Sequence, residues 1–260
     1  MDGCSILNTK YLEKIKDTKL FYPCSGNDLH VPIELFSPYV TDFLFVDRGF
    51  FSPRHRDTVH YGFDAPADKQ RPVLDGDTRY VLKKTKINGP PYWPREKRDI
   101  IPCILSETYM HRASDREVRI HRRRGYGFSA LRTENWIEAL GVFFYRGDSQ
   151  GEGGSGNHWL RGEHLEEVLT KLIPGGLLVL DGSDGSPYKR RTGIYRELCK
   201  YTHNAPPQSP EELIASMNEI TDEKGRHYNC VGYAGERYGP TMIWQVHSNI
   251  YRQNRQLEQG

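Results

Sequence analysis

The chain has 260 residues, 37% of them hydrophobic and 27% charged, and its 16 Tyr, 10 Phe and 4 Trp supply enough apolar surface for a core. This composition excludes a chain that is disordered over most of its length, and a formal net charge of +2 is too small to imply nucleic-acid binding by itself. No run of 18 apolar residues and no secretion signal occurs, so we expect neither a membrane span nor export.

The cysteines and histidines predict no metal centre and no disulfide framework. The five cysteines, an odd number, are Cys4, Cys24, Cys103, Cys199 and Cys230. They are widely spaced and form no CxxC pair, so a reducing, cytoplasmic setting fits best. His158 and His164 are six residues apart, without a third ligand at a recognisable spacing.

The first 47 residues predict a strand, a helix and a second strand after a short N-terminal helix within residues 1–19. Apolar runs at residues 20–23 and 42–47 predict the strands, and the second is typical of a strand covered on both faces. Between them, residues 29–39 have apolar side chains at helical spacing. These elements make a βαβ unit.

The alternation of strand and helix does not continue through residues 48–138, because they are rich in Pro, Gly, Asp and Arg. Strands are predicted within this region at residues 79–87, 100–108 and 117–122. We interpret the region as an insertion or cap within a single domain that covers residues 1–260.

The second half of the chain predicts four strands, two helices and a terminal hairpin formed by the last two strands. The strands are predicted at residues 141–145, 177–180, 228–233 and 241–246. One helix covers residues 163–172 and ends before Pro174-Gly-Gly176; the other begins at Ser209 or Pro210 and ends at Gly225.

Three of the apolar strands run directly into small polar loops. The loops are Cys24-Ser-Gly-Asn-Asp28, the segment from Arg146 to Gly156, and Asp181-Gly-Ser-Asp-Gly185. Ligands sit beyond the carboxyl ends of strands in open α/β sheets, so we expect one shared site. The glycines at 151–156 fit a phosphate cradle or a flexible lid, but the Lys-Ser/Thr of a P-loop is missing.

Gly26 and Asp47 have the spacing of a nucleoside-binding sheet. Gly26 permits close backbone approach to a ligand, and Asp47 ends the second strand about 20 residues later, where an acidic residue accepts hydrogen bonds from a ribose. Two alternatives remain open. The first loop fits a tight turn with Asp28 as helix cap, and Asp47 fits a surface pair with Arg48.

This layout resembles the class I S-adenosylmethionine-dependent methyltransferase fold over about half of the chain. The resemblance is carried by the strand, glycine loop, helix and strand ending in Asp47, by residues 169–181, and by the terminal hairpin. It implies an α/β, Rossmann-like, mostly parallel sheet with helices on both faces and a C-terminal antiparallel hairpin. Cys24-Ser-Gly-Asn-Asp28 stands where the family has three glycines.

The resemblance implies S-adenosylmethionine as cofactor and methyl transfer to an unidentified substrate, a nucleic acid or a nucleotide. It assigns cofactor contacts to Tyr22, Ser25, Gly26, Asp28, Asp47 and Asp181. Ser25, Gly26 and Asp28 would face the methionine end of the cofactor, and Asp47 its ribose.

The resemblance also puts Arg146, Asp148 and Ser149 beside the transferred methyl group. Asp148 could act as a general base toward a hydroxyl or amine, and Arg146 could hold an anionic substrate group. A loop ion pair between Arg146 and Asp148 is the alternative. A second hypothesis keeps the fold and replaces methyl transfer by an enzyme that acts on a nucleotide or another phosphorylated small molecule.

Two basic clusters support a third hypothesis, a non-catalytic module that binds nucleic acid or a partner. The clusters are His121, Arg122, Arg123 and Arg124, and Lys189, Arg190 and Arg191. Tyr126, Phe128 and Tyr188 lie beside them in the sequence, and basic groups with stackable rings suit single-stranded nucleic acid. The alternative interpretation is a solvated charged face.

Overall fold

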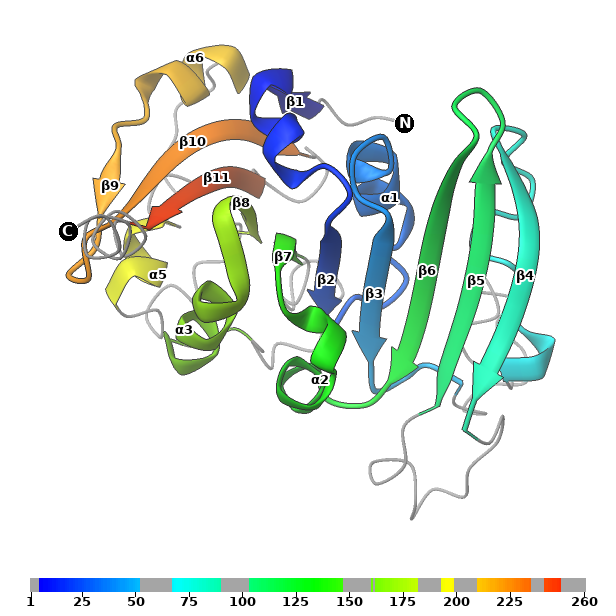
Figure 1. Ribbon diagram of the computed structural model, residues 1–260. Helices are drawn as coiled ribbons and strands as arrows, with labels where there is room; N and C mark the ends of the chain where they lie inside the picture. Colours follow the sequence, from blue (N-terminus) through cyan, green and yellow to red (C-terminus); the bar gives the residue numbers. More distant parts are fainter. Residues whose placement is uncertain are drawn as a thin grey trace, which may run out of the picture. The chain divides into compact units, whose positions relative to one another are not determined.

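The computed structural model describes residues 5–51, 67–89, 103–146, 160, 162–181, 193–198, 210–234 and 241–248. The chain forms two compact units, each with a mixed sheet and a few short helices (Figure 1). Unit 1 comprises Met1–Ile15 and Glu138–Gly260, and unit 2 comprises Lys16–Ile137. The chain is therefore a mixed α/β protein, as predicted.

Unit 2 has a five-stranded sheet in the order β2, β3, β6, β5, β4 (Figure 1). The strands are β2 (Lys19–Pro23), β3 (Asp42–Asp47), β6 (Arg116–Arg124), β5 (Ile104–His111) and β4 (Tyr80–Asn88). The first three strands in this order are parallel, and β5 and β4 continue the sheet in antiparallel pairs. The region of residues 48–138 thus contributes three strands that extend the sheet from β3.

The core of unit 2 is built on the two apolar strands that the sequence predicted. In β3, the side chains of residues 43–46 are all buried, and so are those of residues 20–22 in β2. A strand with neighbours on both edges and cover on both faces needs such a continuous apolar run.

Short helices connect these strands. They are α1 (His30–Phe36), the 3-10 turns η2 (Ala67–Lys69) and η4 (Asn135–Ile137), and α2 (Gly127–Thr133). Ile33 and Phe36 of α1 are buried at the predicted helical spacing. Pro32 lies in the first turn of α1, where its missing N–H breaks no helical hydrogen bond.

Unit 1 has a sheet in the order β1, β10, β11, β8, β7 (Figure 1). The strands are β1 (Ser5–Leu7), β10 (Arg226–Ala234), β11 (Thr241–Ser248), β8 (Leu172–Asp181) and β7 (Leu140–Tyr145), with β9 (Ile220–Thr221) paired to β10. Strands β7 and β8 are parallel, whereas the other pairs are antiparallel. The predicted C-terminal antiparallel hairpin is confirmed as β10 and β11.

The helices in the described part of unit 1 are short. They are η1 (Thr9–Ile15), α3 (Gly162–Lys171), α5 (Gly193–Leu198) and α6 (Pro210–Ser216). Helix α3 matches the helix predicted there, with Leu165 and Val168 buried. Among the described helices of the two units, none is both long enough and apolar enough to cross a membrane.

The N-terminal helix prediction is confirmed as a 3-10 helix, whereas the predicted end of a later helix is wrong. The 3-10 helix η1 lies within residues 1–19 with Leu12 and Ile15 buried, and residues 5–7 before it form β1 by pairing with β10. The helix from Pro210 ends at Ser216 rather than at Gly225, and β9 follows it. Gly225 instead lies in the turn before β10, with a φ of +70° that favours glycine.

Pro174-Gly-Gly176 was predicted to separate helix and strand, but it lies inside β8. A Cβ at Gly176 would lie 2.7 Å from Cγ of Leu172 and 2.9 Å from the carbonyl oxygen of Ile173. Only glycine fits there, and the pairing of β8 with β7 shifts its register over this stretch.

Candidate functional site

The loop after β2 is held in an unusual backbone conformation at the carboxyl end of the strand. Cys24 and Gly26 have φ values of +54° and +52°, and the first of these is uncommon for a residue with a side chain. The N–H of Ser25 donates to the carbonyl oxygen of Val46 at 3.2 Å, which joins the loop to β3. Strained residues of this kind cluster at binding sites.

The carboxylate of Asp47 connects this loop to the end of β3. Its Oδ2 accepts a hydrogen bond from the N–H of Gly26 at 3.1 Å, and its Oδ1 accepts one from the N–H of Gly49 at 2.6 Å. A carboxylate offers about four acceptor positions, and these two bonds use both of its oxygens to hold the loop. The predicted proximity of Gly26 and Asp47 is present in the structure.

Ser25 gives the loop a buried hydroxyl, and Gly26 leaves one side of the loop backbone open. Ser25 is 3% exposed, and its hydroxyl has no hydrogen-bond partner among the described residues. Burying such a group without a partner costs about 1–3 kcal/mol. Beside it, a Cβ at Gly26 would meet no atom within 4 Å, so open space adjoins the loop backbone.

Tyr22 and Asp28 pair with each other across the loop. The Tyr22 hydroxyl donates to Oδ2 of Asp28 at 3.1 Å, while the Tyr22 ring is buried in the core. Asp28 is not the helix cap that the alternative interpretation predicted, because the N-cap position of α1 is Leu29 and no side chain caps the helix. Tyr22 therefore orients Asp28 at the edge of the loop.

The remaining predicted site residues belong to unit 1. Arg146 directly follows β7 and Asp181 ends β8, two parallel strands in which Tyr145 lies opposite Leu180. Asp148, Ser149 and the glycines at 151–156 lie outside the described residues. The structure thus brings together Tyr22, Ser25, Gly26, Asp28 and Asp47.

The prediction that the arginines of β6 form a surface for nucleic acid needs correction. Arg122, Arg123 and Arg124 are 3%, 5% and 1% exposed. The first pairs with Glu107 and the second with Glu134, each at 2.7 Å. These side chains therefore lie in the interior of unit 2 and not on a surface open to nucleic acid. Lys189, Arg190 and Arg191 lie outside the described residues.

The sequence carried a signal for this burial. Val118 and Ile120 are buried, and Arg122 and Arg124 continue the same two-residue alternation along β6. Because alternate residues of a strand point to the same face, both arginines belong to the core face. The apolar alternation was the better guide than the basic run.

Glu107 is the centre of a buried polar network on this face. Its Oε1 accepts from Nη2 of Arg122 at 2.7 Å, and its Oε2 accepts from the N–H of Val73 at 3.0 Å and the hydroxyl of Tyr109 at 2.8 Å. Burial, together with the nearby carboxylate, raises the pKa of Tyr109. The network holds the chain segment around Val73 against the sheet.

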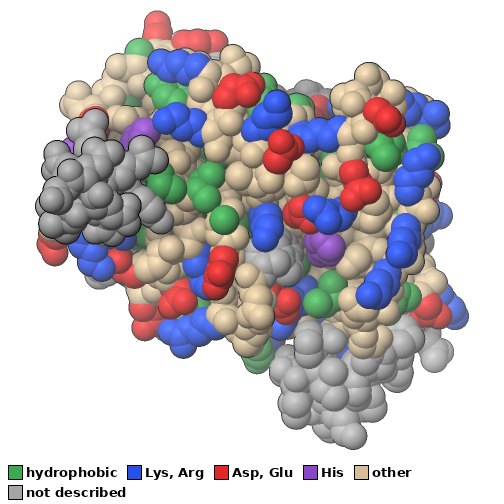
Figure 2. All heavy atoms as spheres, viewed as in Figure 1, with side chains coloured by type: hydrophobic (Ala, Val, Ile, Leu, Met, Phe, Trp, Pro, Cys, Tyr) green, Lys and Arg blue, Asp and Glu red, His purple; other side chains and the backbone are tan. Residues whose placement is uncertain are grey.

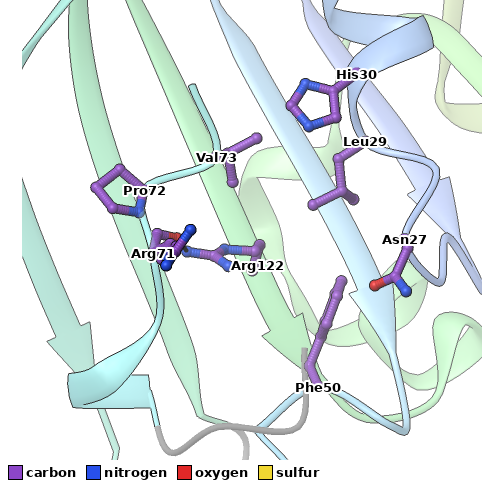
Figure 3. Close-up of a pocket in the computed structure, with 8 residues that line it drawn as sticks. All are labelled: Asn27, Leu29, His30, Phe50, Arg71, Pro72, Val73 and Arg122. Carbon is purple, nitrogen blue, oxygen red and sulfur yellow. Dashed lines mark hydrogen bonds between the residues drawn. The ribbon is translucent and has the colours of Figure 1, made fainter. Parts of the chain in front are cut away.

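A small pocket lies between this segment, the start of α1 and the end of β3 (Figure 3). Leu29, Phe50 and Val73 form apolar walls, and Arg122 of β6 lines the pocket as well. Its volume is about 30 Å³, more than a single water requires. The Nε of Arg122 is buried and has no hydrogen-bond partner among the described residues.

The other polar groups around the pocket come from two separate segments of the chain. They are Asn27 in the loop after β2, His30 at the start of α1, and Arg71 after η2, all with exposed side chains (Figure 3). No pattern in the sequence signals this grouping, because only the fold brings Arg71 to Asn27 and His30. Within the described ranges, no group of three or more His, Cys, Asp or Glu residues could hold a metal ion.

Exposed lysines follow the edge strand of unit 2. Lys83, Lys84 and Lys86 of β4 are all exposed, and Figure 2 shows basic side chains along the part of the surface that β4 and β5 occupy. Cross-strand pairing arranges further polar residues beside two of them. Two rows result, Lys84–Thr108–Arg119 and Lys86–Ser106–His121. The basic side chains of these two rows are exposed or half-buried, unlike the buried arginines of β6.

Comparison of the chain with protein-family models, with curated proteins and with solved structures finds no significant match in any of the three. What the site binds is therefore inferred from its own atoms.

Proposed function

We propose that unit 2 binds S-adenosylmethionine at the carboxyl ends of β2 and β3, and that the protein transfers the methyl group of this cofactor to a substrate. The observation that carries the proposal is the link from Gly26 N–H to the Asp47 carboxylate. It joins a loop able to approach a ligand closely to an acidic group able to accept from a ribose. Bound cofactor supplies an electrophilic methyl group on a sulfonium centre.

The strand order of unit 2 supports this proposal. Along the chain, β2, β3 and β6 are its first, second and third parallel strands, and they lie in the order β6, β3, β2. The same order forms one half of doubly wound nucleotide-binding sheets. Helices on both faces of the parallel strands belong to the same proposal, as does a reducing, cytoplasmic setting.

The residues of the loop fit the cofactor. The buried hydroxyl of Ser25 would gain a partner in its amino acid end, and the open space beside Gly26 would admit it. Asp47 holds the loop and places an acidic group at the end of β3, where such a group accepts from ribose hydroxyls. These residues bind and orient, which is the main task of the protein in an in-line displacement.

The proposal assigns substrate handling to the segment after β7. Asp148 would take the proton of an attacking hydroxyl or amine, Arg146 would hold an anionic substrate group, and Ser149 would lie beside the transferred group. Arg146 follows the last residue of β7 directly, so its backbone is fixed by the sheet of unit 1. The other two residues lie outside the described part of the chain.

Isothermal titration calorimetry with S-adenosylmethionine and S-adenosylhomocysteine tests the proposal. We expect both ligands to bind the wild-type protein, and Asp47→Asn to weaken binding by about tenfold or more, because a charge-assisted bond is lost. Ser25→Ala should weaken binding while leaving the unfolding midpoint of the free protein unchanged or higher, since it removes an unpartnered buried hydroxyl.

Asp75→Asn is the matched control, because Asp75 is an exposed carboxylate of the same unit outside the loop. It should bind both ligands as the wild type does. If neither ligand bound at millimolar concentration, the proposal would be wrong.

A second candidate function is contact with the phosphate backbone of single-stranded nucleic acid. The observation that favours it is the pair of cross-strand rows, which alternate cations with short hydroxyl side chains on an exposed sheet face (Figure 2). Lysines and hydroxyls are common partners of phosphate oxygens. The competing explanation is that the lysines of β4 protect an edge strand against pairing with another chain.

Fluorescence anisotropy with a labelled single-stranded RNA separates these explanations. Phosphate contacts predict binding that weakens as NaCl rises, and Lys84→Gln with Lys86→Gln should lower the salt slope by roughly 1 to 1.5. Lys10→Gln with Lys16→Gln removes the same charge from exposed positions outside β4 and should leave the slope unchanged. Equal slopes for the two double variants would favour the edge-protection role.

A further inference from the structure

We infer that the pocket beside α1 binds a phosphate group, carried by a small organic molecule whose apolar part lies against Leu29 and Phe50 (Figure 3). This inference goes beyond the proposed cofactor site, because it concerns a different set of atoms. The pocket takes Asn27 from the loop, whereas the proposed cofactor contacts use Ser25, Gly26 and Asp47.

A side chain that lines the pocket has an unused donor. Arg122 lines the pocket with a side chain that is 4% exposed. Its Nη1 donates to Gln70 and its Nη2 to Glu107 and the carbonyl oxygen of Arg71, but its Nε–H has no partner among the described residues. Buried donors in native proteins are nearly always paired, so this one indicates a missing acceptor.

The lining of the pocket is positively charged. The pocket has no carboxylate among its lining residues. The charge of Arg122 is balanced by Glu107, whereas Arg71 makes no ion pair with the described residues. The guanidinium of Arg71 therefore gives the pocket a positive charge, which favours an anion.

The donors around the pocket are also arranged in a way that suits a phosphate. Arg122 lies in β6, Arg71 after η2, and His30 and Asn27 around the start of α1, so their groups come from different sides (Figure 3). A tetrahedral phosphate presents acceptor oxygens in several directions, whereas a carboxylate presents two in one plane. Leu29, Phe50 and Val73 add apolar walls, which free phosphate would not use.

The test is a titration of isotope-labelled protein with inorganic phosphate and with phenyl phosphate, at ionic strength held constant with NaCl. The arginine Nε–H signals are followed by nuclear magnetic resonance, because the buried Nε–H of Arg122 should respond directly. We expect both ligands to give a saturable shift of one protected Nε–H signal. Tighter binding of phenyl phosphate identifies an organic phosphate, and equal binding would overturn that part of the inference.

Arg71→Gln should weaken phosphate binding by about tenfold or more, since it removes a charged donor from an exposed position without touching the buried network. Arg112→Gln is the matched control, because Arg112 is an exposed arginine in the turn after β5, outside the pocket. Equal binding by the two variants, no saturable shift in the wild type, or benzoate binding as tight as phenyl phosphate would each overturn the inference. None of these outcomes depends on S-adenosylmethionine, so the two proposals fail separately.

Discussion

Glu107 and Arg122 form an ion pair whose side chains are 2% and 4% exposed. Removing two charges from water is costly, and the cost is recovered only where the remaining donors and acceptors are also bonded. Here the partners include Val73 N–H, Gln70 and the carbonyl oxygen of Arg71, all in the segment of residues 70–73 that forms one wall of the pocket through Arg71 and Val73. The ion pair therefore fixes the position of that wall.

Replacing Glu107 by Gln should destabilise the protein strongly. The substitution keeps the shape of the side chain but leaves the buried charge of Arg122 without its counter-ion. Breaking a buried pair in this way costs about 3 kcal/mol or more. Urea unfolding followed by circular dichroism would measure the loss as a lower midpoint.

Glu117→Gln is the control for this prediction, because Glu117 lies in β6 with a half-exposed side chain 3.7 Å from Arg119. An exposed pair of this kind contributes little, so the control should change the free energy of unfolding by about 0.5 kcal/mol or less. If both variants lost the same stability, the buried pair would not have the structural role given to it here.

Prediction from sequence succeeded at single residues where spacing along the chain was informative. Asp47 and Gly26 were expected at adjoining strand ends, and a hydrogen bond joins them. Arg122 was misread because a run of like charges was given more weight than its position in the alternation of β6. Arg71 and His30 meet only through the fold, so no local pattern could have grouped them.

At the scale of elements, buried strands were the easiest to predict. The apolar runs of β2, β3 and β7 gave each strand to within one or two residues of its observed ends, because a covered strand needs a continuous apolar sequence. Strand β6 is less apolar, since its core face ends in two arginines that are buried with it.

Short helices and small strands were predicted poorly, because partners distant in sequence decide them. Residues 5–7 become β1 only through pairing with β10, more than 200 residues later. Likewise, Ile220 of β9 pairs with Tyr228 of β10 instead of continuing α6. Intrinsic helix propensity is weak enough for such pairing to override it.

At the scale of the whole molecule, the chain leaves unit 1 after Ile15 and returns to it after Ile137. Unit 1 is therefore assembled from two parts of the chain, and its first strand and its C-terminal hairpin depend on each other. Each unit combines parallel strands with antiparallel ones at its edge. The proposed cofactor loop and the pocket use residues of unit 2 alone.

Both units contain carboxylates whose ionised form is stabilised by folding. In unit 1, burial tends to raise the pKa of Asp222, but hydrogen bonds from Arg226 and Tyr228 outweigh it and lower the pKa. Burial also tends to raise the pKa of Glu166, but hydrogen bonds from Arg226 and Lys224 outweigh it and lower the pKa. In unit 2, burial tends to raise the pKa of Asp42. Hydrogen bonds with His121 and Thr41 and the nearby charge of Arg119 outweigh this effect and lower the pKa.

A lowered pKa in the folded state means that the unfolded chain binds protons first as the pH falls, so folding stability is lost on the acid side. The ordinary values are 4.5 for Glu and 3.8 for Asp, so the loss should begin near pH 4.5 and continue below pH 3.8. Thermal unfolding between pH 7 and pH 3 would measure it. Asp222→Asn should reduce the drop in midpoint, whereas Asp68→Asn, at an exposed position, should retain it. A midpoint that stayed constant to pH 3 would contradict the stabilising role of these carboxylates.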